Sequence, residues 1–409
     1  MCTTTSLVVA AAVVGLTAGW LHAGGQPSSL PAADQPELTR GNTAFALDLH
    51  RRLAEKPGNL FVCPLSLSTA LAMTYAGARG ETATQMAGVL HFELPPERLH
   101  PAFAAMLAKL DAPDCGTGHR LHVANALWVQ SGYTLLPEFL AVGRAGYRAG
   151  LESLDFVADT EGARQTINNW VAARTEQKIQ ELIGPGILSQ TTRLVLTNAI
   201  YFKGAWAARF DPQATHDAPF TLADGRQVSA PLMFQEGEFG YFEQPELQGL
   251  ELAYAGDRFS MVILLPRTPV ELSRLERSLS PERLNEWLGG LSRQKVRVWL
   301  PRFSVTAEFR LDEALRAMGM RDAFDPSRAD FSGMDGTRNL YIGAVLHKAF
   351  VEVNEEGTEA AGASAVVMKL RATPEPPPSF RADHPFLFLI RDLGTGSVLF
   401  TGRLANPAP

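Results

Sequence analysis

Residues 344–371 read AVLHKAFVEVNEEGTEAAGASAVVMKLR, and this stretch decides how the C-terminal part of the chain is interpreted. Residues 344–353 have a strand-like sequence, whereas residues 357–365 consist mainly of small side chains. One basic residue, Arg371, then precedes a proline-rich segment at 374–378. Composition alone allows two interpretations. The segment is either a flexible linker or an exposed bait loop whose small residues let it enter a β-sheet.

The sequence after this segment favours the bait loop. Residues 386–390 and 397–400 are short apolar runs, and the connection between them contains Gly394 and Gly396. Two such runs joined by glycines predict a β-hairpin. Strand-like sequence therefore lies on both sides of the loop, which places the loop inside one folded unit. A long structureless insertion in a compact domain is usually functional.

The composition is typical of one large globular domain. The chain has 409 residues, of which 46% are hydrophobic and 20% charged, and we expect a single domain at 37–407 with its loop at about 355–380. The net charge is −6 and no basic run is longer than Arg51-Arg52. These features predict no nucleic-acid partner and no stable membrane partner.

The N-terminal residues resemble a targeting segment. An apolar run from Leu7 to Trp20 precedes small residues near Gly24, which predicts a signal peptide at 1–23 and a short tether at 24–36. The expected protein is therefore secreted and extracellular. No Lys or Arg precedes the apolar run, so a periplasmic or membrane-anchored protein is the alternative. Removal of the leader leaves Cys63 and Cys115, whose spacing indicates neither a disulfide framework nor a metal site.

Helical and strand patterns are interspersed without regular alternation, which predicts the α+β class. The helices are expected at 45–53, 64–75, 166–183 and 312–318. The strands are expected at 121–129, 193–201, 259–265 and 295–300. Residues 259–265 are apolar nearly throughout, as in a strand that is buried on both faces.

The chain lacks the usual signatures of catalysis. It has no nucleophile elbow, zinc-protease helix, Cys-x-x-Cys pair, Walker loop or dinucleotide glycine fingerprint. His347 lies in a predicted strand and is interpreted as a structural residue. We therefore expect neither an enzyme nor a bound cofactor or metal. A hydrolase whose catalytic triad is dispersed along the sequence remains an alternative.

Five blocks of sequence carry a resemblance to a known family. They are residues 59–66 (NLFVCPLS), 197–206 (TNAIYFKGAW), 329–334 (ADFSGM), 347–354 (HKAFVEVN) and 380–386 (FRADHPF). In this order they resemble the serpins, and the resemblance extends over residues 37–407. It implies three β-sheets, eight or nine helices and an exposed reactive-centre loop in a monomeric protein.

The resemblance also implies which residues are functional. Counting seventeen residues from Glu355, as in inhibitory serpins, puts the reactive bond at Arg371–Ala372, with Lys369 as the fallback. The implied hinge consists of Glu355, Glu356, Gly357, Thr358, Glu359, Ala360, Ala361, Gly362 and Ala363. Ser66, Asn198 and His347 would form a polar cluster called the shutter. Trp206 would be the tryptophan at the top of the sheet. Cys63 stands where serpins usually carry a serine, which puts the usual shutter network in doubt.

The implied activity is inhibition of a serine protease by trapping. The protease attacks the bait bond and forms an acyl-enzyme, after which the freed loop enters the sheet as a new strand. Alternate loop residues share a face, and both charges, Glu359 and Lys369, fall on the same one. Arg371 suits a pocket with a carboxylate at its base, so the expected partner is a trypsin-like serine protease. A non-inhibitory serpin acting as a carrier, chaperone or storage protein is the alternative.

Overall fold

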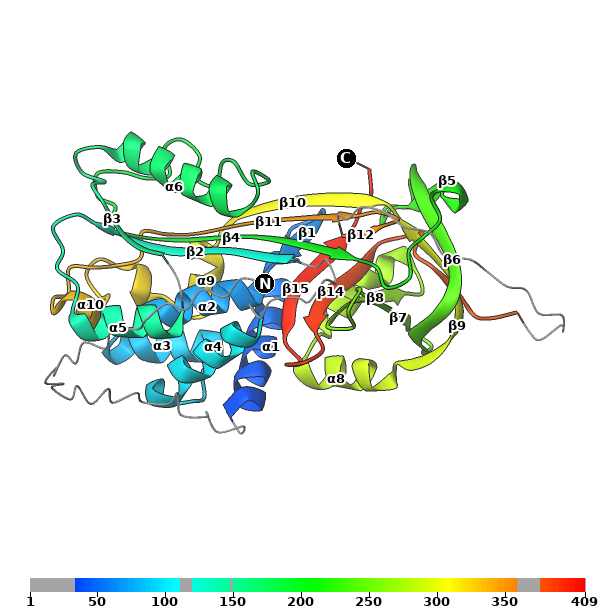
Figure 1. The fold of residues 1–409 in the computed structure, drawn as a ribbon, viewed down its shortest axis with the longest axis horizontal. Helices are drawn as coiled ribbons and strands as arrows, with labels where there is room; N and C mark the ends of the chain where they lie inside the picture. The colour runs from blue at the N-terminus through cyan, green and yellow to red at the C-terminus, as the bar shows by residue number, and fades with distance from the viewer. Residues whose placement is uncertain (1–33, 111–119, 148–149, 359–375, 409) are drawn as a thin grey trace, which may run out of the picture.

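Two β-sheets and the helices packed on them form the protein (Figure 1). The computed structural model describes residues 34–110, 120–147, 150–358 and 376–408. The helices are α1 (Asp34–Leu53), α2 (Pro64–Tyr75), α3 (Gly80–Leu90), α4 (Pro96–Leu110), α5 (Pro137–Gly146), α6 (Thr160–Arg174), α7 (Leu272–Arg277), α8 (Pro281–Gly290), α9 (Asp312–Met318) and α10 (Ser332–Asp335). The strands are β1 (Leu60–Val62), β2 (Arg120–Gln130), β3 (Gly150–Leu154), β4 (Leu194–Ala205), β5 (His216–Thr221), β6 (Gln227–Glu243), β7 (Leu247–Ala253), β8 (Phe259–Pro266), β9 (Ser292–Pro301), β10 (Phe303–Arg310), β11 (Ala344–Val353), β12 (Gly357–Thr358), β13 (Ser379–Arg381), β14 (Phe386–Asp392) and β15 (Val398–Leu404).

The strand pairing confirms the α+β class. A six-stranded sheet has the order β10-β11-β4-β2-β3, with β12 also paired to β4. A nine-stranded sheet has the order β1-β15-β14-β8-β7-β6-β9-β13, with β5 paired to β6. The expectation was three sheets, but β6 is 17 residues long and pairs with both β7 and β9. Its length joins two of the expected sheets into one, and ten α-helices occur in the described residues instead of eight or nine.

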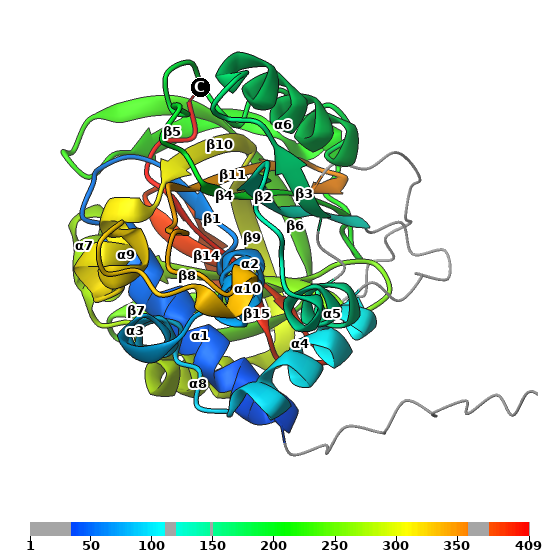
Figure 2. The same cartoon turned by 90° about the vertical axis from the view of Figure 1, so that its left-hand side faces the viewer.

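The six-stranded sheet lies between helices. α6 covers one of its faces, and α2 lies beneath the other (Figure 2). Leu196 and Ile200 of β4 belong to the main core on the α2 side, whereas Val195 and Ala199 pack with α6. The alternating faces of one strand therefore enter two different cores.

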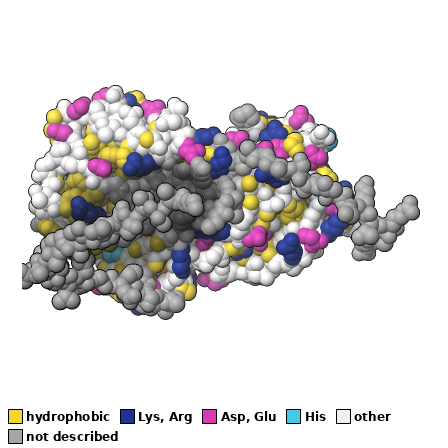
Figure 3. Space-filling model, viewed as in Figure 1, with side chains coloured by type: hydrophobic (Ala, Val, Ile, Leu, Met, Phe, Trp, Pro, Cys, Tyr) yellow, Lys and Arg dark blue, Asp and Glu magenta, His cyan; other side chains and the backbone are white. Residues whose placement is uncertain are grey.

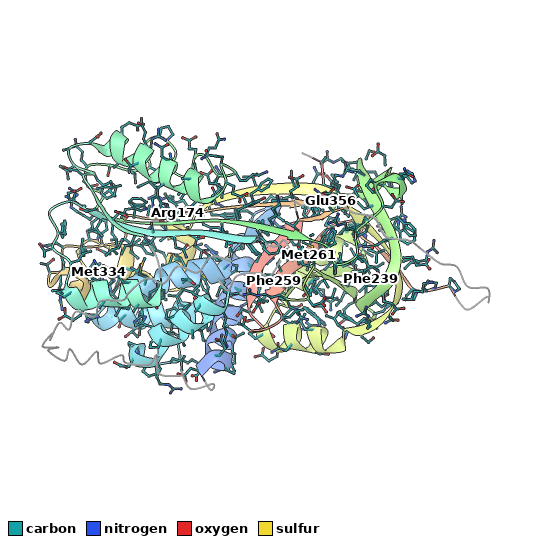
Figure 4. The ribbon with its side chains drawn as sticks, viewed as in Figure 1. Arg174, Phe239, Phe259, Met261, Met334 and Glu356 are labelled. Carbon is teal, nitrogen blue, oxygen red and sulfur yellow. The ribbon has the colours of Figure 1, made fainter. Side chains whose placement is uncertain are left out.

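β8 confirms the prediction of a strand buried on both faces. Phe259 and Met261, labelled in Figure 4, belong with Ile263 to the main core. The intervening Val262 and Leu264 pack in the cluster that includes α7 and α8. The strand pairs with β7 and β14, so its backbone is hydrogen-bonded on both edges. The predicted hairpin near the C-terminus is the antiparallel pair β14–β15.

Several expected helix boundaries differ in the structure, including the start of α6, which lies at Thr160 instead of residue 166. The described part of α1 starts at Asp34, inside the segment predicted to be a tether, and the buried Asp34 carboxylate accepts hydrogen bonds from Arg98. The helix expected at 166–183 ends at Arg174, because the next residues take positive φ values at Glu176 and Gln177. The buried Asn168 side chain then binds the backbone of Leu182 and Ile183, which folds this segment back over α6. Residues 1–33 lie outside the described part of the chain.

A buried ion pair fastens α1 and α7 to β15. Arg403 donates to both carboxylate oxygens of Glu276, at 3.1 and 3.2 Å, and His50 contacts the same carboxylate at 3.2 Å. The side chains of Arg403 and Glu276 are only 7% and 5% exposed. Arg403 also donates to three backbone carbonyls near the end of α1. All three nitrogens of the guanidinium therefore donate hydrogen bonds that fix this corner of the fold.

We expect Glu276→Gln to destabilise the protein by about 3–5 kcal/mol, because it leaves the buried Arg403 cation without a counter-ion. The measurement is the shift in the midpoint of urea unfolding. The control is Arg283→Gln, which removes an exposed pair with Glu246 at 3.8 Å and should cost less than about 1 kcal/mol. Equal effects of the two substitutions would contradict a structural role for the buried pair.

No helix within the described ranges has both the length and the apolar content needed to span a bilayer. Among these same residues there is also no cluster of three or more His, Cys, Asp and Glu side chains suited to a metal ion. On the face shown in Figure 3, basic and acidic side chains are interspersed.

Candidate functional site

The candidate site is the seam between β4 and β11 in the six-stranded sheet. These strands are parallel neighbours from Val195↔Ala344 to Tyr201↔Phe350. Beyond Tyr201, β4 changes its partner, because Gly204 and Ala205 pair with Thr358 and Gly357 of β12 instead. β12 runs antiparallel to β4, follows directly from β11 and contacts both strands. The sheet is thus opened at one end by the first residues after β11, near Glu356 in Figure 4.

Backbone contacts hold this short strand in the seam. Trp206 N donates to Glu356 O and Phe210 N donates to Glu355 O, both at 2.9 Å. Gly357 has a φ of 148°, and a Cβ at this position would lie 2.2 Å from the carbonyl oxygen of Gly204. Only glycine allows the two backbones to approach so closely.

Side chains anchor the same residues. Thr358 is fully buried and its hydroxyl lies 2.8 Å from the hydroxyl of Tyr254. The Glu355 carboxylate accepts a hydrogen bond from Thr215 at 2.7 Å and forms an ion pair with Arg302. Burial alone would raise the pKa of Glu355, but the hydrogen bonds from Arg302 and Thr215 hold it below the usual value. Glu355 is therefore ionised and tied down at neutral pH.

Trp206 lies under this junction. Its indole stacks on Tyr254 with ring centroids 4.7 Å apart, and its Nε1 donates to Asn354 O at 3.0 Å. The side chain is buried at the end of β4, next to the residues that enter the seam. Trp206 therefore packs where a strand added to this sheet would begin.

A buried polar cluster crosses the seam at its centre. Register places Asn125 of β2, Asn198 of β4 and His347 of β11 side by side. Asn198 Oδ1 accepts from His347 Nδ1, and Asn198 Nδ2 donates to Asn125 Oδ1 and to Ser66 Oγ. Ser66, in the first turn of α2, donates to Asn125 Oδ1 at 3.0 Å. The three strands and α2 are thereby joined by one hydrogen-bond network.

Cys63 takes part in this network through its backbone. Cys63 N donates to His347 Nε2 at 3.2 Å, and the thiol does not cap α2. Cys63 is a free, buried cysteine, and burial raises the pKa of its thiol. The bond to His347 does not depend on the thiol, because it comes from the backbone N–H of Cys63.

His347 is neutral in this network. Burial lowers the pKa of His347 to about 3, since its ring has one donor and one acceptor role to fill and no room for a charge. The unfolded chain, with a pKa near 6.5, therefore binds more protons than the folded chain between about pH 3 and 6.5. The stability from this group is complete above pH 6.5 and is lost as the pH falls toward 3.

We expect His347→Gln to reduce the loss of stability on acidification. His347 can lower the free energy of unfolding by up to about 1.4 kcal/mol for each pH unit below 6.5. Some dependence remains, because burial also lowers the pKa of His100, to about 4. Urea unfolding midpoints between pH 7 and pH 4 measure the effect. The exposed His216→Gln is the control, and an unchanged pH profile in His347→Gln would contradict the assignment.

The structure thus brings together Ser66, Asn198 and His347, and separately Trp206 with Glu355, Glu356, Gly357 and Thr358. The remaining predicted site residues lie outside the described part of the chain: Glu359, Ala360, Ala361, Gly362, Ala363, Lys369, Arg371 and Ala372. The sequence did not predict Asn125, Tyr254 or Arg302 as site residues. Asn125 interrupts the apolar run at 123–129, which was the only local signal for any of the three.

The geometry defines a class of protein in which the first residues of a loop separate two neighbouring strands of a sheet at one end. In this chain the loop begins after β11, and the strands are β4 and β11 of the six-stranded sheet. The chain belongs to the serpin family, since the family model described as "Serpin (serine protease inhibitor)" matches residues 40–407. The chain is 44% identical to the leukocyte elastase inhibitor of Bos taurus and 42% identical to that of Homo sapiens. Each match covers 91% of this chain and all of the relative. The crystal structure of uncleaved ovalbumin superposes with a TM-score of 0.81 at 31% identity, over 91% of this chain and all of that one. These matches confirm the serpin fold.

The comparisons correct the prediction of location. The leukocyte elastase inhibitors match over their whole length with 91% of this chain, and the family match begins only at residue 40. The relatives therefore offer no counterpart for the predicted leader, and the prediction of a secreted, extracellular protein is wrong. The prediction of location depended on the apolar run from Leu7 to Trp20 alone, which lies before the first residue of the family match.

Proposed function

We propose that this serpin inhibits trypsin-like serine proteases by acting as a suicide substrate. The protease serine attacks the carbonyl carbon of Arg371, the amine of Ala372 leaves, and an acyl-enzyme forms. The freed segment then enters the seam between β4 and β11 and carries the protease with it. The observation that carries this proposal is the position of β12, which already occupies the first two places of such a strand.

The observed register defines the inserted strand. Gly357 faces Ala205 and Thr358 faces Gly204, so each later residue would face the preceding residue of β4. If this register continues, residues 358–368 would pair in antiparallel order with residues 194–204 of β4. Residue 368 would then face Leu194, the first residue of β4. Arg371 would then follow the end of the strand, so that the whole length of β4 is used before the bait residue.

The two faces of the inserted strand fit their surroundings. Ser364 would face Asn198 and, with Thr358 and Val366, would point toward the main core, as the even-numbered residues of β4 do. The other face would turn toward α6. Glu359 would face the partly exposed Lys203, and opposite charges in directly facing positions are favourable in an antiparallel pair.

The pairing of β4 with β11 supplies a reason for insertion. These neighbours are parallel, and parallel pairs are slightly less stable per residue than antiparallel ones. A strand antiparallel to both would replace one parallel ladder with two antiparallel ladders. Each added bond contributes about 0.5–1.5 kcal/mol, while ordering a residue costs about 1–2 kcal/mol. Burial of the core-facing residues must therefore add to the bonds for insertion to be favourable.

Arg371 supports the trypsin-like class of target. Its planar guanidinium forms paired hydrogen bonds with a carboxylate, as a trypsin-like specificity pocket requires. The relatives are named for elastase, and that name describes their own targets. The specificity that Arg371 gives to this chain is tested separately. The family match at 40–407 supports the proposed domain at 37–407, with the loop at about 355–380.

Incubation of the whole chain with trypsin tests the proposal. The expected result is a complex that survives boiling in detergent, together with a released fragment that begins at Ala372. Clean cleavage with full residual trypsin activity would contradict it and would favour the non-inhibitory alternative. The family assignment already argues against a hydrolase with a dispersed triad, because the description of the family is protease inhibition.

A further inference from the structure

An aromatic and cationic face lies on the nine-stranded sheet. The register places Phe234 of β6, Trp299 of β9 and Arg381 of β13 in one row across three strands. The Phe234 and Trp299 ring centroids are 4.8 Å apart. The guanidinium of Arg381 lies 5.5 Å from the Trp299 centroid, and that of Arg297 lies 4.9 Å from it. We call Phe234, Arg297, Trp299 and Arg381 the Trp299 face.

This face points away from the core. Val296, Val298 and Leu300 of β9 are buried, whereas the alternating Arg297 and Trp299 are partly exposed. An indole held at the surface between two guanidinium groups combines the residue types that contribute most to protein interfaces. The core does not need these side chains in this arrangement, since the opposite side of β9 already packs inward.

The charges of the face favour an acidic partner. Arg381 forms an ion pair with Asp383 at 2.8 Å. Arg297 stacks on Trp299, and no ion pair to its side chain occurs within the described ranges. Stacking uses the flat side of a guanidinium and leaves its N–H groups free for a carboxylate. Glu236 faces Arg297 across the strands but pairs with Lys295 at 2.6 Å, so among the described residues Arg297 can bind an incoming carboxylate without breaking an existing pair.

The position of the face suggests which partner it meets. Arg297 N donates to Pro378 O at 2.9 Å, and Gln248 Nε2 donates to Ser379 O at 3.1 Å, so the chain that follows the bait bond is fixed beside this face. The intervening residues 372–378 can span at most about 25 Å. A globular protease of about 230 residues is about 45 Å across. A protease bound at Arg371 is therefore wide enough to reach the Trp299 face.

We propose that the Trp299 face is a second contact surface for the target protease, where Arg297 and Trp299 engage an acidic patch on that enzyme. This inference rests on the proposed inhibitory function. The face would raise the rate of encounter with acidic proteases, because complementary charge steers association. It takes no part in loop insertion, which occurs in the other sheet.

Anionic and cationic trypsin, which share their specificity for arginine but differ in surface charge, provide the test. We expect Arg297→Glu to lower the association rate constant with anionic trypsin about tenfold at low salt and to change that with cationic trypsin much less. Trp299→Ala should lower the rate with anionic trypsin by a similar factor. In both variants the stoichiometry of inhibition should stay unchanged. The control is Arg274→Glu, the same charge change on the exposed surface of α7.

The outcomes separate the two proposals. If the wild type forms no detergent-stable complex with either trypsin, both the inhibitory function and the second contact surface are wrong. If the wild type traps both enzymes but Arg297→Glu and Arg274→Glu have equal effects, only the second contact surface is wrong. Circular dichroism of Arg297→Glu, whose side chain is at the surface, checks that a lower rate does not come from misfolding.

Discussion

Replacing Thr358 with arginine is expected to turn the protein from an inhibitor of trypsin into a substrate. Thr358 is fully buried between the strands, with its hydroxyl on Tyr254 and its backbone paired to Gly204. An arginine here would place an unpaired cation in the core, which costs several kcal/mol. Each 1.4 kcal/mol slows a step about tenfold, so insertion should slow by at least about a hundredfold and hydrolysis of the acyl-enzyme should overtake it. Detergent-stable complex should disappear while cleavage at Arg371 continues.

Two variants control for this result. Thr358→Ser keeps the hydroxyl that contacts Tyr254, so its stoichiometry of inhibition should stay near that of the wild type. Glu356→Arg introduces an arginine two residues earlier, at a partly exposed position, and should inhibit much better than Thr358→Arg. If Thr358→Arg trapped trypsin as efficiently as the wild type, the seam between β4 and β11 could not be the path of insertion.

The sequence predicted much of the seam because its residues act locally. The apolar pattern predicted a strand at 193–201 that contains Asn198, and β4 runs from Leu194 to Ala205. α2 and α9 lie at the predicted 64–75 and 312–318, since each has a clear start and an apolar pattern. The prediction for 166–183 was wrong at its end, because the apolar spacing of Ile179 and Leu182 comes from a segment folded back on Asn168.

The contacts that part the sheet could not be predicted in this way. The pattern of residues 358–369 shows which side chains share a face, but the register depends on backbone pairing with distant strands. Tyr254 and Thr358 are 104 residues apart, and Arg302 and Glu355 are 53 residues apart. No periodicity links such residues. Asn125 was missed for the same reason, because its partners Ser66 and Asn198 come from other segments.

The anchored start of the loop and the polar cluster divide the seam into two parts. At one end, β12 already separates β4 from β11, and the buried Thr358 shows that the core accepts a residue there. At the centre, His347 and Asn198 still bind each other directly across the parallel pair. A strand that grows from β12 must therefore break this hydrogen bond. In the proposed mechanism, the cluster would oppose opening until the protease has cut the loop and freed it to advance.

The bait residue should determine which protease is trapped, and Arg371→Val is expected to lower the association rate constant with trypsin by at least about a thousandfold. The substitution removes the paired hydrogen bonds between the guanidinium and the pocket carboxylate and leaves that buried charge unpaired, at a cost of about 4 kcal/mol. A small apolar side chain suits an elastase pocket, so the rate with pancreatic elastase should rise. Both rates are measured from the loss of protease activity over time.

Lys369→Ala is the matched control, because it removes a positive charge two residues before Arg371 and should leave the rate with trypsin within about twofold of the wild type. If Lys369→Ala abolished trapping and Arg371→Val did not, the reactive bond would be Lys369–Leu370. If neither variant affected trypsin and the wild type trapped elastase faster, the bait would be one of the apolar residues before Lys369. Mass spectrometry of the released C-terminal fragment decides among these outcomes independently of the rates, since only cleavage after Arg371 yields a fragment that begins at Ala372.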